Sequence, residues 1–140
     1  MRNIFDSSDQ SDILQRLEKL HYKSICLSGK MNPTEMLAHC CEPLQVAMGD
    51  IEVASNPIGL IKKLFSNKKE IISDEHQRQE EFIQWKNNLI IIIERLRVNG
   101  KSIIKSEKLP RLLFSGRVTK DKWAEINYTH IDHHLRQFGV

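Results

Sequence analysis

Two histidines near the end of the chain have the spacing of a metal-binding pair. His130 and His134 stand four residues apart in the segment 119–140, which reads T-K-D-K-W-A-E-I-N-Y-T-H-I-D-H-H-L-R-Q-F-G-V. On a helix, residues at this spacing lie one turn apart on the same face, so both imidazoles can reach one metal ion. A pair supplies two ligands, and a metal site of this kind needs a third from elsewhere in the chain.

Four segments carry the sequence signals of helices. We expect helices over 7–20, from Pro33 to about Met48, from 74 to about 99 and from 120 to about 138. Asn32 and Glu35 flank Pro33 in the pattern of a capping box, which marks a helix start. Thr119 and Gly139 mark the start and the end of the last helix. These helices predict an all-α fold, a four-helix bundle, as a single domain over 1–140.

The second predicted helix supplies a third histidine, His39. Ligand sites in four-helix bundles are built on the inward faces of facing helices, so His39, His130 and His134 are the candidate metal ligands. Three imidazoles can hold Zn²⁺ or a similar divalent ion and leave a coordination position for water or substrate. Pro43 lacks the N–H that would bond the carbonyl of His39, so we expect a kink there. A site with special geometry and a tolerated packing kink explain Pro43 equally well.

Four other polar residues are candidates for supporting the metal site or binding its ligand: Glu42, Asn127, His133 and Gln137. Glu42 follows His39 by three residues and is a candidate general base, with a solvated side chain as the alternative. Asn127 and Gln137 fall on the histidine side of the last helix and could hydrogen-bond a bound ligand. His133 lies off that face and could instead be a surface residue, whereas Asp132 is expected to cap or pair locally.

The links between the helices carry apolar residues that need cover. The run 89–93, L-I-I-I-I, makes one turn apolar on every side, so it lies under the connection 101–118 or in a subunit interface. We favour the interface and expect a homodimer through helix faces. The connection contains Leu109-Pro110 and 112–114, L-L-F, so we expect its middle to pack onto the bundle. The weaker pattern of 50–72 suggests one short amphipathic turn.

Composition and charge exclude several classes of function. The net charge of +3 comes largely from basic residues in 95–122, with few interleaved aromatics and no nucleic-acid motif, so no nucleic-acid partner is expected. The longest apolar run, 89–93, is far below the roughly 20 residues of a membrane span, and the first residues show no signal peptide. We therefore expect a cytoplasmic protein that binds no membrane. Three cysteines without C-x-x-C spacing argue against disulfides or an all-cysteine zinc site.

Two segments closely resemble a branch of small bacterial proteins in the DinB/YfiT-like superfamily. They are 29–40, G-K-M-N-P-T-E-M-L-A-H-C, and 128–139, Y-T-H-I-D-H-H-L-R-Q-F-G, together with Pro43, Leu44 and Trp123. The resemblance implies an up-down-down-up four-helix bundle, often dimeric, with a divalent metal on one histidine of the second helix and two of the fourth. By position these are His39, His130 and His134. The segment 50–72 departs from the branch in being shorter.

The resemblance also narrows the expected activity. Characterised members of the superfamily include metal-dependent thiol transferases and a maleylpyruvate isomerase that uses low-molecular-weight thiols. The expected function is therefore divalent-metal binding, by Zn, Ni or Fe, in a metal-dependent hydrolase or thiol transferase with an open coordination position. Its substrate would be a small molecule or a thiol. The alternative is a non-catalytic helical bundle with a structural or vestigial histidine site.

Overall fold

The computed structural model describes residues 1–52, 74–114 and 116–140. Its described parts contain α1 (Ser7–Lys19), α2 (Pro33–Met48), α4 (Glu75–Asn99) and α5 (Lys120–Gln137). These bounds agree closely with the predicted helices, so the all-α prediction is confirmed. The short turn predicted within 50–72 lies, apart from 50–52, outside the described residues.

Side-chain caps set the helix starts at the positions that the sequence signals indicated. Asn32 accepts a hydrogen bond from the Glu35 backbone N–H, and the Glu35 carboxylate accepts one from the Asn32 N–H, which completes the capping box of α2. Thr119 caps α5 by accepting from the Lys122 N–H. At the other end of α2, Gly49 adopts the left-handed conformation (φ 78°) that a helix C-cap favours in glycine.

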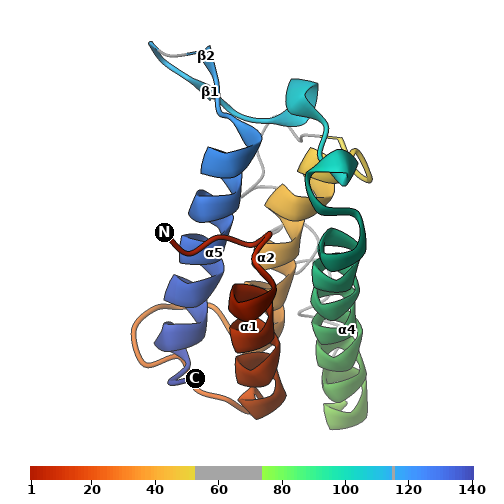
Figure 1. The fold of residues 1–140 in the computed structure, drawn as a ribbon. Coiled ribbons are helices and arrows are strands. Elements are labelled where there is room, and N and C mark those ends of the chain that lie inside the picture. The colour runs from red at the N-terminus through yellow and green to blue at the C-terminus, as the bar shows by residue number, and fades with distance from the viewer. Residues whose placement is uncertain (53–73, 115) are drawn as a thin grey trace.

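The four helices close into a ring. In Figure 1, α1 and α5 run in one direction and α2 and α4 in the opposite one. Each of α1 and α2 packs against both α4 and α5. Buried side chains from all four helices form one cluster, including Ile13, Leu44, Ile93 and Ile131. Within this ring α2 and α5 lie beside one another, and they carry the three candidate ligands (Figure 1).

The connection from α4 to α5 contains elements that the sequence did not predict. It consists of the 3₁₀ turns η1 (Gly100–Ile103) and η2 (Ser106–Lys108) and a small antiparallel hairpin of β1 (Arg111–Leu112) and β2 (Gly116–Arg117). Arg111 lies opposite Arg117 in this hairpin. The hairpin projects beyond the end of the bundle in Figure 1.

The prediction that the middle of this connection packs onto the bundle is confirmed for Leu109, which is buried, and wrong for 112–114. Leu113 and Phe114 are 94% and 98% exposed, because they lie at the turn of the projecting hairpin. Leu109 packs into the core as predicted, and so do Ile104 and Val118 toward the ends of the connection. The backbone N–H of Lys105 also donates to the carbonyl of Ala47, which ties the connection to the end of α2 (N···O 2.8 Å).

The apolar turn of α4 is buried on one side. Leu89, Ile92 and Ile93 belong to the core, whereas Ile91 is 56% exposed. The predicted homodimer interface stays a prediction. Among the described helices, none is both long enough and apolar enough to cross a bilayer.

Candidate metal centre

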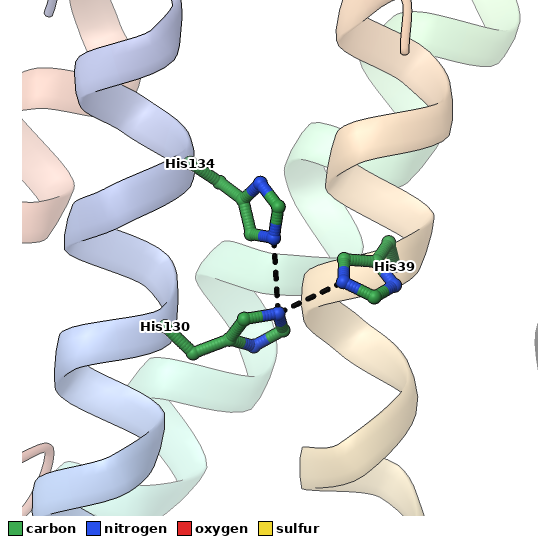
Figure 2. Close-up of side chains that lie close together, drawn as sticks. All are labelled: His39, His130 and His134. Atoms are coloured by element: carbon green, nitrogen blue, oxygen red, sulfur yellow. Dashed lines mark hydrogen bonds between the residues drawn. The ribbon is translucent and has the colours of Figure 1, made fainter. Parts of the chain in front are cut away.

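Three imidazole rings converge between α2 and α5 (Figure 2). The Nε2 atom of His130 lies 2.8 Å from the Nε2 of His39 and 3.0 Å from the Nε2 of His134. The ligand atoms of all three rings lie within 4.8 Å of one another, close enough to bind one metal ion. The two helices thus bring together all three histidines that the sequence indicated.

Hydrogen bonds alone cannot satisfy this arrangement. A ring nitrogen has either one N–H or one in-plane lone pair, so the Nε2 of His130 cannot make two well-directed hydrogen bonds at once. The planes of the three rings are also steeply inclined, at 78° or 90° to each other. A cation between the rings would accept all three lone pairs. An all-imidazole donor set suits Zn²⁺ and also Ni or Fe, so the residues fit a divalent transition metal.

Gln137 fixes the tautomer of His134. The Gln137 side-chain N–H donates to the backbone carbonyl of Ser28 (2.8 Å), which identifies the nitrogen end of the amide because that carbonyl can only accept. The amide oxygen therefore faces the Nδ1 of His134 at 2.8 Å, so Nδ1 must carry the proton. The lone pair of His134 is left on Nε2, which points toward the other two histidines (Figure 2). Such outer contacts are typical of metal-binding histidines.

The environment keeps all three imidazoles neutral, which is the form that binds a metal. Burial and the neighbouring His39 and His134 rings lower the pKa of His130 to about 4. Burial is also the main cause that lowers the pKa of His39 and of His134. Few protons would have to leave the site at neutral pH before a metal could bind.

A cavity of about 640 Å³ adjoins the histidines. His39 and His130 form part of its wall, so a molecule in the cavity would lie against the ligand cluster. Its apolar wall comes from α2, the connection and α5, and includes Pro43, Val46, Leu109, Val118, Trp123 and Ile126. A volume in this range is usual for small-molecule sites.

The four supporting residues predicted from the sequence occupy different places. Glu42 and Asn127 line the cavity, and the Asn127 side chain donates to the Trp123 carbonyl (2.9 Å). Burial raises the pKa of the Glu42 carboxyl, which makes it a stronger base than an ordinary glutamate. Gln137 supports His134 from outside the cluster. His133 is exposed, with its ring centroid 5.2 Å from that of His134, and it does not belong to the three-histidine cluster.

Sequence reasoning missed the contacts that hold α5 against α1. Arg16 on α1 donates to Asp132 (2.6 Å) and to the carbonyl of Val140 (3.1 Å). Asp132 also pairs with Arg136 one turn later (3.0 Å), which is the local pairing that the sequence suggested. The spacing from Asp132 to Arg136 signals this local pair, whereas no spacing signals Arg16. Ser28 was also missed, because only the fold brings its carbonyl to Gln137.

Cysteine supplies no ligand or nucleophile at this site. Cys40 and Cys41 are fully buried. Burial raises the pKa of both thiols, to about 12 for Cys41, so neither is a thiolate at neutral pH.

The evidence for the function of this site comes from its own residues alone. It offers three neutral imidazoles with converging Nε2 atoms, one fixed tautomer and an adjoining apolar cavity. A comparison with protein-family models, curated proteins and solved structures finds no significant match to this chain.

Proposed function

We propose that the protein binds one divalent transition metal through His39, His130 and His134 and uses it in an enzymatic reaction on a small molecule in the adjoining cavity. The observation that carries this proposal is the convergence of three Nε2 atoms, 2.8 Å and 3.0 Å apart, beside a cavity that His39 and His130 help to line. A purely structural metal site is usually closed by protein ligands, whereas a catalytic one keeps a position for water or substrate. Three ligands beside a cavity match the second arrangement.

Membership of the DinB/YfiT-like superfamily is part of this proposal. The opposed directions of α1 with α5 and of α2 with α4 support it, because the superfamily bundle has this order of directions (Figure 1). The placement of one histidine on α2 and two on α5 supports it as well. The catalysed reaction and the identity of the metal are also proposals.

The residues around the cavity suit a hydrolase better than a thiol transferase that uses a cysteine of the chain. When bound, the metal would act as a Lewis acid and lower the pKa of a coordinated water or thiol. Glu42, whose pKa is raised by burial, would accept a proton at the cavity wall. The apolar wall would exclude bulk water around the substrate. Transfer to a thiol would require a thiol from outside the chain, because none of Cys26, Cys40 and Cys41 lines the cavity.

The deciding experiment measures metal content by mass spectrometry, on protein purified without a metal-affinity tag. We expect about one equivalent of a transition metal in the wild type, as one three-histidine site implies, and loss of that metal in His39→Ala. His21→Ala removes an exposed histidine that is not part of the cluster and should retain the metal. Absence of metal from the wild type, with no change in melting on adding Zn²⁺ or Ni²⁺, would exclude the metal site.

A structural metal site is the second candidate, because the three ligands join α2 to α5 across the bundle. The Glu42→Gln variant separates the two functions. An enzyme should keep its metal and lose turnover of a panel of small esters and amides, whereas Glu18→Gln, an exposed change on α1, should leave turnover intact. A structural site would show no turnover in any variant, and its melting temperature would follow metal occupancy.

We also propose a homodimer through the outer face of α4. Ile83, Ile91 and Val98 are 46%, 56% and 80% exposed on that helix, at intervals of eight and seven residues that place them in one stripe. Light scattering should give twice the monomer mass, and Ile91→Asp should give the monomer. A monomeric wild type would exclude this interface without affecting the metal proposal.

A further inference from the structure

The cavity beside the histidines has a wall that selects for an apolar ligand. Val46 from α2, Leu109 and Val118 from the connection, and Trp123 and Ile126 from α5 contribute aliphatic and aromatic surface from several sides. A ligand that fills this space would bury its own apolar surface against them, and such burial is the main source of affinity for uncharged groups.

The charged groups on the wall are poorly arranged for a polyanionic ligand. Lys108 pairs with Glu52 (3.1 Å), and Arg117 donates to the backbone carbonyl of Leu109 (2.9 Å). Glu42 and Glu107 also line the cavity and add negative charge. Phosphate-rich molecules such as nucleotides need several free cations or a helix N-terminus, and the described wall offers no such cluster.

The polar groups near the histidines are few. Glu42 and Asn127 share the wall with His39 and His130, so a polar head group has partners at this part of the cavity. The Asn127 amide is held by its hydrogen bond to Trp123, so its orientation is set before a ligand arrives. A ligand of mixed character, with one polar head and an apolar body, matches this distribution.

We propose that the substrate class of this site is a small molecule with an uncharged alkyl or aryl body and a single oxygen- or sulfur-containing head. The head lies at His39 and His130, and the body lies along Val46, Trp123 and Ile126. This inference rests on the proposed function, because the head is the group that the metal would hold. It excludes nucleotides, sugar phosphates and other highly charged metabolites as substrates.

Hydroxamates of different chain length test the inference on the Zn²⁺-loaded protein, because the hydroxamate head binds the metal whatever the chain. Isothermal titration compares acetohydroxamate with octanohydroxamate. Each buried methylene should tighten binding about fourfold, so burial of about half of the longer chain should lower its Kd roughly 50-fold or more. Equal binding of the two compounds, within about threefold on this scale, would overturn the inference while the metal site stands.

A matched pair of variants locates the apolar body. Ile126 lines the cavity and is 46% exposed, whereas Ile25, in the connection between α1 and α2, is 79% exposed and does not line it. Ile126→Asp should reduce the chain-length gain about tenfold, since a charge at the wall opposes burial of the alkyl chain. Ile25→Asp should leave the chain-length gain unchanged, and an equal loss in both variants would also overturn the inference.

A metal-free measurement keeps the two proposals distinguishable. Binding of the uncharged fluorophore N-phenylnaphthylamine to the apo-protein reports the cavity alone. We expect Ile126→Asp to abolish this fluorescence and Ile25→Asp to retain it. Protein that binds the fluorophore in this pattern but holds no metal would refute the proposed function and support the apolar specificity. Protein that holds metal but does not bind the fluorophore would support the metal site of the proposed function and refute the apolar specificity.

Discussion

Replacing Gln137 with leucine should weaken metal binding without removing a ligand. The substitution deletes the acceptor for the Nδ1–H of His134 and the donor to the Ser28 carbonyl, each at 2.8 Å. Without an acceptor at Nδ1, the proton of His134 can move to Nε2, and that tautomer cannot bind the metal. Loss of such an outer contact typically reduces metal affinity 10- to 100-fold, which corresponds to about 1.4–2.7 kcal/mol.

Competition with a chromophoric chelator would measure the Zn²⁺ affinity of each variant. Gln137→Glu keeps an acceptor for Nδ1–H and loses the donor to Ser28, so it should bind Zn²⁺ more tightly than Gln137→Leu. Gln15→Leu, an exposed change on α1, should match the wild type. A loss of less than about threefold in Gln137→Leu, well under the expected range, would refute the tautomer argument. Equal loss of Zn²⁺ affinity in Gln137→Glu and Gln137→Leu would also refute it, because loss of the hydrogen bond to the Ser28 carbonyl would then explain the whole effect.

Three other properties follow from the structure. The folded apo-protein should lose stability as the pH falls from about 6.5 toward 4, because the pKa of His130 is lowered to about 4 and the unfolded chain binds more protons in that window. Urea unfolding at several pH values measures this loss, and the urea midpoint should change less with pH in His130→Asn. Arg16→Met should destabilise the fold by about 2 kcal/mol, since it removes one of two cationic partners from an Asp132 side chain that is only 17% exposed. Chemical denaturation of Arg16→Met, Asp132→Asn and the double variant checks this. If the losses of unfolding free energy in the two single variants add up in the double variant, the two side chains do not pair directly. Metal at about 100 times its Kd should stabilise the folded protein by about 2.7 kcal/mol, which raises Tm by roughly 5–15 °C. In a thermal melt, the Tm of His134→Ala should not rise when the metal is added.

Local signals in the sequence were sufficient to predict the helices. The Asn32 and Glu35 capping box and the Thr119 cap each concern residues within one turn, so their physical effect does not depend on the rest of the fold. The hairpin escaped prediction because strands of two residues leave no alternating pattern to detect. Its apolar turn also misled the prediction, since Leu113 and Phe114 suggested burial that the projecting turn does not allow.

The metal ligands were predictable to the extent that they depend on helix geometry. The spacing of His130 and His134 fixes their common face, and His39 followed from its place in the second helix. The role of Gln137 was only partly predictable. Its distance from His134 along α5 indicated a supporting residue, but the identity of its second partner depends on the loop that carries Ser28. Contacts between segments that are distant in the sequence have no spacing to reveal them.

Pro43 connects the helix that carries a ligand with the cavity that adjoins it. A proline inside a helix costs about 3 kcal/mol, and here it removes the donor that would bond the carbonyl of His39. The helix nevertheless continues from Pro33 to Met48, so the proline does not serve to end it. Its ring forms part of the cavity wall together with His39 and Val46. Pro43 thus lies in the wall beside a candidate ligand, which is the position that a role in the site requires. A packing role is met there equally, so the two explanations that the sequence offers both stand.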